Sequence, residues 1–177
     1  LLYGFKSIND RGFLNTNSFI EMQNYLEPNK PGIRKLPGTK IQNQITGDVL
    51  YTPPDGEELI RKLLANYEQY YNDISDDVDP LIKNAILHYQ FEAIHPFYDG
   101  NGRTGRILMV LHLILSKRLL LPVLFISGFL HKNRTDYYNL LRGVTAENNW
   151  KDWILFVLNA IEEQSKSTMK TINIILA

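Results

Sequence analysis

Twelve consecutive residues combine side chains that could handle a phosphorylated ligand. Residues 95–106 read H-P-F-Y-D-G-N-G-R-T-G-R. Gly100, Gly102 and Gly105 lie just before and within the first turn of an apolar stretch, 107–115, that is typical of a buried helix. Backbone N–H groups at such a helix start have no partner within the helix, and the helix dipole adds partial positive charge. The pattern predicts an anion-binding loop.

The charged side chains of the same segment point to phosphate chemistry. Arg103 and Arg106 are three residues apart on the first turn, so they face the same way and suit phosphate oxygens. Cations at a helix start oppose the dipole, which indicates an anion between them. Asp99 would repel that anion unless a hard cation such as Mg²⁺ bridges the two. His95 can accept a proton near neutral pH, so the set predicts chemistry at a nucleotide phosphate.

Taken singly, several of these residues would have plain structural roles. A lone histidine before proline is usually a structural loop residue, and a lone Gly-Asn-Gly is usually a turn, but their combination in this order favours a functional site. A P-loop is excluded because no Gly-Lys-Ser/Thr follows the glycines. A protein-kinase site is excluded because no strand lysine and no Asp-Phe-Gly accompany the loop.

Short elements precede the loop. Residues 17–26 predict a helix that ends before Pro28. Residues 39–43 and 48–52 predict the one β-hairpin of the chain, around the turn composition of 45–48. Apolar side chains then recur at helical spacing from residue 59 to residue 71, which predicts an amphipathic helix of about four turns.

The next helix leads into the loop. Asp79-Pro80 is a cap followed by proline at the first helical position, and it predicts a helix through Phe91. We expect one apolar stripe on it, made of Ile82, Ala85, Ile86, Tyr89 and Ala93. His88, on this helix, is expected to pack in the core or on the helix surface, and His112 to be part of the hydrogen-bonded structure. Trp150 and Trp153 are expected to pack the last helix and not a nucleotide base.

The apolar stretch 107–115 should be the central helix, with the other helices packed around it. Residues 136–141 and 150–161 predict two more helices. No repeat and no Gly- or Ser-rich linker divides residues 1–177, so we expect a single domain of mostly α class with one hairpin. The apolar run is about half of the roughly 18 residues that a membrane span needs.

Composition narrows the function classes. The chain has 177 residues, and its 19 Lys and Arg balance 19 Asp and Glu, so no overall field attracts nucleic acid or an anionic membrane. Cysteine is absent, which excludes thiolate catalysis, disulfides and cysteine-ligated zinc. We expect a cytoplasmic protein with neither nucleic acid nor membrane as a partner.

Residues 95–106 resemble the signature of the Fic (filamentation induced by cAMP) family, H-P-F-x-[D/E]-G-N-G-R-x-x-R, at every fixed position. Residues 34–52 resemble that family's flap, and Tyr137-Tyr138 resembles the tyrosine pair that follows its motif. The resemblance covers roughly residues 1–160. It implies the Fic fold, a helical bundle around a central motif loop and helix, here 95–116.

The resemblance implies a protein adenylyltransferase, which transfers AMP from ATP to a Ser, Thr or Tyr hydroxyl of a target protein and releases pyrophosphate. His95 would be the general base, Phe97 the buried anchor of the loop, and Asp99 the ligand of Mg²⁺ or Mn²⁺. Nucleotide-binding residues would come from the motif and a later helix: Gly100, Asn101, Gly102, Arg103, Arg106, Asn133, Tyr137 and Tyr138. The target backbone would pair with four flap residues: Thr39, Lys40, Ile41 and Gln42.

Within that implication, Gly100, Asn101 and Gly102 form an anion hole, with Asn101 near the α-phosphate. Arg103 and Arg106 hold the outer phosphates. Two alternatives stay open: another Fic-type nucleotidyl or phosphoryl transfer or removal of AMP, and a non-catalytic nucleotide-binding regulatory module. The presence of His95 speaks against the module, because a pure binder needs no base. The target could include the chain itself, and self-association is compatible with the sequence.

Many Fic proteins carry an inhibitory helix with the pattern [S/T]-x-x-x-E-[G/N]. The only glutamate here that is followed by Gly or Asn is Glu147, and the residue four before it is Gly143, so the pattern is absent from these 177 residues. We expect any such helix to lie upstream of residue 1 or in a partner protein.

Overall fold

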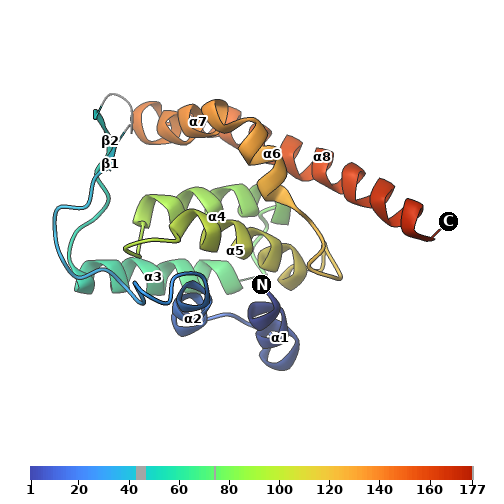
Figure 1. The fold of residues 1–177 in the computed structure, drawn as a ribbon, viewed down its shortest axis with the longest axis horizontal. Coiled ribbons are helices and arrows are strands. Elements are labelled where there is room, and N and C mark those ends of the chain that lie inside the picture. Colours follow the sequence, from blue (N-terminus) through green and yellow to red (C-terminus); the bar gives the residue numbers. More distant parts are fainter. Residues whose placement is uncertain (43–46, 74, 177) are drawn as a thin grey trace.

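A computed structural model describes residues 1–42, 47–73 and 75–176. Eight helices and one two-stranded sheet make up this described part of the chain (Figure 1). In chain order they are α1 (Leu2–Arg11), α2 (Thr16–Leu26), β1 (Ile41–Gln42), β2 (Val49–Tyr51), α3 (Glu57–Asn72), α4 (Pro80–Ile94), α5 (Asn101–Leu115), α6 (Ile126–Lys132), α7 (Arg134–Glu147) and α8 (Trp150–Leu176). The mostly α class with one hairpin is confirmed.

Helix α5 lies at the centre of the bundle, as its sequence predicts. Every residue from Leu108 to Leu115 is buried. Helix α4 packs along it, with α1, α2 and α3 on one side of this pair and α6, α7 and α8 on the other (Figure 1). A helix that is apolar nearly all round can be stable only when neighbours cover every face. Because α5 begins at Asn101, this burial fixes the motif at one end of the bundle core.

The cap of α4 is confirmed, but its predicted apolar stripe is wrong. Asp79 accepts a hydrogen bond from Leu81 N at 2.8 Å, and the helix runs through Ile94. Of the stripe, only Ala85 is buried, whereas Ile82 is 37% exposed. The buried face instead includes polar side chains whose hydrogen bonds cross to other elements, such as Asn84, which donates to Met109 O at 2.8 Å. Apolar periodicity alone misses such a face.

The predicted hairpin is confirmed as an antiparallel pair, although its strands are shorter than expected. Ile41 pairs with Tyr51, and Gln42 with Val49. The hydroxyl of Tyr51 donates to Ala93 O at 2.9 Å, which ties β2 to the last turn of α4. Of the predicted turn, residues 45 and 46 lie outside the described residues, as do residues 43 and 44 of the flap.

Three helical features escape the sequence patterns. Helices α1 and α6 were not predicted, and α8 continues to Leu176, well past the expected end at residue 161. Helix α6 starts without a side-chain cap, so no local signal marks its beginning. Beyond Ile161, α8 extends away from the bundle and none of its described residues is buried (Figure 1). None of the helices in the described part of the chain has the length and apolar character that crossing a membrane requires.

Candidate active site

The motif loop joins α4 to α5 through two residues in the left-handed backbone region. His95 ends α4 with φ 47°, and Gly100 precedes α5 with φ 82°. Glycine adopts this region freely, but a histidine does so rarely, and such residues cluster at functional sites. The N–H of Thr104 donates to Gly100 O at 2.9 Å, and this is the first backbone hydrogen bond of α5. The preceding N–H groups fit the predicted anion-binding start.

A buried arginine from a distant segment fixes the histidine. Arg34 is fully buried, and its Nε donates to His95 O at 2.8 Å. Its guanidinium also pairs with Asp55 at 2.9 Å and donates to Pro54 O. The backbone N–H of Arg34 donates to Pro96 O at 2.9 Å. The sequence patterns did not indicate this role, because nothing local links residue 34 to residue 95.

Inside the loop, Phe97 and Asn101 form a closed unit. Phe97 is fully buried, as predicted for the anchor, and forms an isolated β-bridge with Ile33. Asn101 is also buried, and its side chain binds both the N–H and the carbonyl of Phe97. Gln23 of α2 adds a donor to Asp99 O at 3.1 Å, a contact that the sequence did not suggest.

His95 has the protonation state that a base requires. Its Nδ1 is buried and has no hydrogen-bond partner among the described residues. Burial lowers the pKa of His95 to about 4, because an imidazolium would lose its hydration there. At neutral pH the ring is therefore uncharged and can accept a proton.

His95 lines a cavity of about 460 Å³ that lies between the hairpin, the motif and α7. Its walls are formed by Ile41, Leu50, Tyr51, Tyr89, Glu92, Ala93, His95, Gly102, Tyr138, Asn139, Leu141, Arg142, Thr145 and Ala146. The structure thus brings together four members of the predicted set: Ile41 of the flap, His95, Gly102 and Tyr138. The α7 residues at 138, 141, 142 and 145 share one helix face, and that spacing could have revealed them in the sequence.

A second cavity, of about 510 Å³, shares Tyr138 with the first. Arg106 and Tyr137 also line it, together with residues of α6. Arg106 donates from Nε to Ser127 Oγ at 3.1 Å and forms no ion pair with any described residue. Its cationic group is therefore available to a ligand.

Arg103 is engaged differently from Arg106. It forms an ion pair with Glu27, the residue that follows α2, and lies 3.6 Å from Asp99. The two arginines bind partners in different segments of the chain, although both line a groove of about 250 Å³ beside the start of α5. Their shared role at outer phosphates stays a prediction.

Asp99 fits a metal ligand of the kind that acts together with phosphates. Its side chain is 48% exposed, and the N–H of Gly100 lowers its carboxyl pKa, with Lys30 and Arg103 adding to the effect. It is therefore ionised at neutral pH. Residues 1–42, 47–73 and 75–176 contain no group of three or more His, Cys, Asp or Glu that could hold a metal. Mg²⁺ is often bound by one carboxylate plus substrate phosphates, and Asp99 matches that donor set.

Two predicted nucleotide contacts, Asn133 and Tyr137, offer little exposed surface to a ligand. Asn133 is not among the described residues that line either cavity, and its amide donates to Phe129 O at 3.0 Å. Tyr137 is buried, with its hydroxyl 3.0 Å from His88 Nε2. Tyr138 is 46% exposed and packs edge-on against Tyr137. Of this group, Tyr138 offers the most open surface to a ligand.

The packing and hydrogen-bonding roles expected for the remaining aromatic and histidine side chains are confirmed. His88 and His112 are buried, and His112 Nδ1 lies 3.2 Å from Asn84 Nδ2. Trp153 is fully buried and donates to Ala85 O at 2.9 Å. Trp150 packs edge-on against Tyr89.

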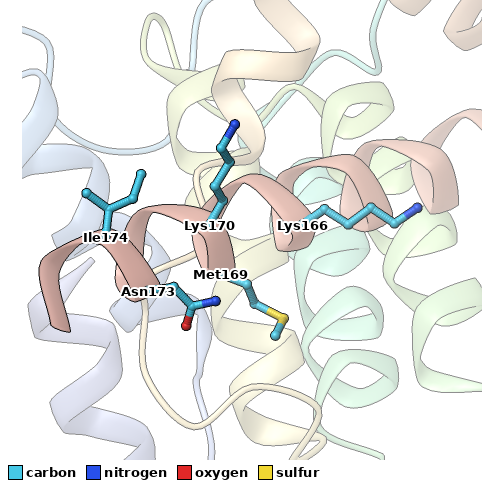
Figure 2. Close-up of a pocket in the computed structure, with 5 residues that line it drawn as sticks. All are labelled: Lys166, Met169, Lys170, Asn173 and Ile174. Carbon is cyan, nitrogen blue, oxygen red and sulfur yellow. The ribbon is translucent and has the colours of Figure 1, made fainter. Parts of the chain in front are cut away.

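A further hollow lies beside the last turns of α8, away from the motif. Figure 2 shows the residues that line it: Lys166, Met169, Lys170, Asn173 and Ile174. All of them belong to α8, and the hollow contains neither a histidine nor a carboxylate. It is not a catalytic candidate.

Comparisons with known proteins identify the family of the chain. The sequence model of the Fic/DOC family matches residues 13–113, more than half of the chain. Protein adenylyltransferase Fic of Drosophila grimshawi is 30% identical over 111 residues, which cover 62% of this chain and 22% of that protein. Protein adenylyltransferase fic-1 of Caenorhabditis briggsae is 37% identical over 88 residues, 48% of this chain and 16% of that protein. The chain thus spans about a fifth of the length of these curated relatives.

Solved structures share the fold. A Fic family protein from Desulfovibrio desulfuricans G20 superposes with a TM-score of 0.78 at 22% identity, covering 96% of this chain and 51% of that one. Fic-1 of C. elegans (aa134–508) superposes with a TM-score of 0.66 at 22% identity, covering 98% and 49%. At these identities the likeness establishes the architecture.

Proposed function

Because this chain belongs to the Fic/DOC family, we propose that it transfers AMP from ATP to a Ser, Thr or Tyr hydroxyl of a target protein. The observation that carries the proposal is His95. Its uncharged ring lines one cavity together with the flap, the start of α5 and Tyr138. A base beside an anion-binding helix start is the arrangement that nucleotidyl transfer needs.

In this reaction the hydroxyl oxygen of the target attacks the α-phosphorus of ATP. The bond between the α-phosphorus and the oxygen that bridges to the β-phosphate breaks, and pyrophosphate leaves. His95 takes the hydroxyl proton. The N–H groups at the start of α5 bind phosphate oxygens, and Arg106 binds the outer phosphates.

Asp99 would hold Mg²⁺ together with those phosphates. When bound, the ion would neutralise charge on the phosphates of ATP. Lys30 Nζ and Arg103 Nη2 lie 3.5 Å and 3.6 Å from the carboxylate oxygens of Asp99, so these two cations pair with the carboxylate in the free chain.

The target would bind at the flap. Strand β1 pairs with β2 on one side, and in the described residues its other edge carries no strand. An extended peptide can add to such an edge, which would carry its hydroxyl toward the cavity that contains Ile41 and His95. Ile41 and Gln42 are strand residues, whereas Thr39 and Lys40 lead into the strand.

The position of a radioactive label tests the reaction type. The purified chain is incubated with a cell lysate and either α- or γ-phosphate-labelled ATP, and the proteins are then separated and counted. We expect label on protein from α-labelled ATP only. Label from γ-labelled ATP would indicate a kinase, and protein-bound label from neither would indicate a nucleotide-binding module.

A further inference from the structure

The last turn of α4 carries a buried carboxyl group that the proposed reaction does not use. Glu92 lies three residues before His95 and is only 9% exposed. Its Oε1 has no hydrogen-bond partner among the described residues. A Cβ at Gly105 would lie 2.6 Å from this oxygen, and one at Gly102 would lie 3.9 Å from it. The carboxyl therefore rests directly against the first turns of α5.

Arg106 lies beside the same glycine. A Cβ at Gly102 would lie 3.1 Å from the Arg106 Nη1 atom. The guanidinium and the Glu92 carboxyl thus both border the space that glycine leaves open at position 102. The two groups do not form an ion pair. Burial raises the pKa of Glu92 to about 7, and the positive charge of Arg106 opposes that rise, so the two charges are coupled.

Few other titratable groups face Glu92. On its own helix, His88 places Nδ1 3.3 Å from the Cβ position of Gly105, and burial lowers the pKa of His88 to about 3. Tyr67 of α3 and Tyr137 of α7 are buried, and their pKa values rise through burial and, less strongly, through Glu92. His95 ends the same helix with a pKa of about 4. These neighbours are uncharged at neutral pH, so Arg106 is the cation that balances Glu92.

We propose that Glu92 and Arg106, which border the same space at Gly102, are coupled through their charges, so that Glu92 takes up a proton when the outer phosphates of ATP bind the guanidinium. This inference rests on the proposed function, because it assigns the outer phosphates to Arg106. An amide or an alkyl side chain of similar size would fill the same space, but neither could exchange a proton when the anion arrives.

The coupling has a definite sign. Phosphates near Arg106 add negative charge beside Glu92, which favours its protonated form, so ATP binding takes up a proton. Below pH 7 the Glu92 carboxyl is already protonated, so ATP binding requires no proton uptake. As the pH rises through about 7, the free chain loses the proton, and ATP affinity falls by up to tenfold for each pH unit.

The test compares ATP dissociation constants of the wild-type chain and Glu92→Gln at about pH 6 and about pH 8.5, measured by calorimetry. At each pH the constant of one protein is divided by that of the other. This ratio cancels the effect of the ionisation of ATP, which is the same for both proteins. We expect equal affinity at the lower pH and, at the higher pH, binding by Glu92→Gln that is on the order of tenfold tighter. Glu58→Gln, an exposed position on α3, is the matched control and should follow the wild type.

A ratio that is the same at both pH values would overturn the proposal, and so would weaker binding by Glu92→Gln at both. A second measurement does not need ATP: the carboxyl carbon of Glu92 is titrated by NMR in the wild-type chain and in Arg106→Ala. Removal of Arg106 should raise the pKa of Glu92, and an unchanged pKa would show that the two side chains are not coupled. A chain that binds no ATP would refute the proposed function. The titration would still show whether the charges of Glu92 and Arg106 are coupled.

Discussion

Asn101 holds the backbone of Phe97 from both sides. Its Oδ1 accepts a hydrogen bond from Phe97 N at 2.9 Å, and its Nδ2 donates to Phe97 O at 2.8 Å. The asparagine is the first residue of α5, and the phenylalanine is the anchor of the loop, so one side chain joins the helix start to the loop core. The loop keeps its shape through this contact.

Replacing Asn101 with Ala should therefore weaken the whole domain. Both hydrogen bonds disappear, and the buried N–H and carbonyl of Phe97 are left without partners. We expect the free energy of unfolding to fall by about 1–3 kcal/mol, measured by denaturant titration. Asn101→Asp keeps the acceptor oxygen, so its free energy of unfolding should lie between those of Asn101→Ala and the wild type. Equal stability of Asn101→Ala and the wild type would mean that water replaces the amide.

Arg34 and Asp55 form an ion pair, and replacing Arg34 should lower the free energy of unfolding more than replacing Asp55. Arg34→Ala removes a fully buried side chain and leaves His95 O and Pro54 O without their donor, so we expect a loss of about 2–4 kcal/mol in the free energy of unfolding. Asp55 is partly exposed, and Asp55→Asn leaves the Arg34 contacts to His95 O and Pro54 O in place, so this change should destabilise the protein less than Arg34→Ala. Equal costs for the two variants would contradict the assignment of Arg34 as the anchor of His95.

Gly105 should not tolerate a side chain. A Cβ at this position would lie 2.6 Å from Oε1 of the buried Glu92 and 3.3 Å from the buried ring of His88, so Gly105→Ala should lower the free energy of unfolding by about 1–3 kcal/mol. The control is Gly143→Ala in α7, where the Cβ has only an ordinary contact at 3.8 Å with Asn149. That change should stabilise the protein by up to about 1 kcal/mol, because alanine favours a helix. Thermal unfolding of both variants decides the prediction, and a loss of the same size in both would refute it.

Acid should destabilise the domain through its buried histidines. Burial lowers the pKa of His88 to about 3, so below the ordinary histidine pKa of about 6.5 the unfolded chain binds a proton that the folded chain does not. Stability therefore falls as the pH drops from about 6.5 toward 3. Over the first two pH units the loss should be on the order of 2 kcal/mol for this residue.

His88→Gln removes the titrating group and should flatten the dependence of stability on pH in that range. Denaturant unfolding at several pH values provides the measurement. A variant with the same slope as the wild type would place the acid sensitivity elsewhere, for instance at His112, whose pKa burial lowers to about 4.

The sequence predicts local features of this fold better than long-range ones. The apolar run after residue 107 requires a central helix, and the glycines around residue 100 require a tight helix entry, so both follow from neighbouring residues. Arg34 could not be predicted, because its role depends on Pro54 and His95 approaching it in space. Glu92 was missed for a related reason: glutamate is rarely buried, and its burial here depends on the packing of α5 against α4.

The buried face of α4 shows the same limit. Asn84 and Lys83 are buried there because Met109 O and Asp76 supply partners, and no pattern within α4 reveals those partners. The flap is an intermediate case. Its strand positions follow from β-prone residues, but the hydrogen bond from Tyr51 to Ala93 that places it beside His95 does not.

The proposed AMP transfer depends most on His95, which would act as its base. The most direct measurement is the initial rate of label transfer from α-labelled ATP to protein, by the wild-type chain and by His95→Ala, at ATP concentrations that saturate each. We predict near-normal ATP binding by His95→Ala and a transfer rate lower by about 10²–10⁴, the range typical of a lost general base. Transfer by His95→Ala at the wild-type rate would show that His95 is not the base.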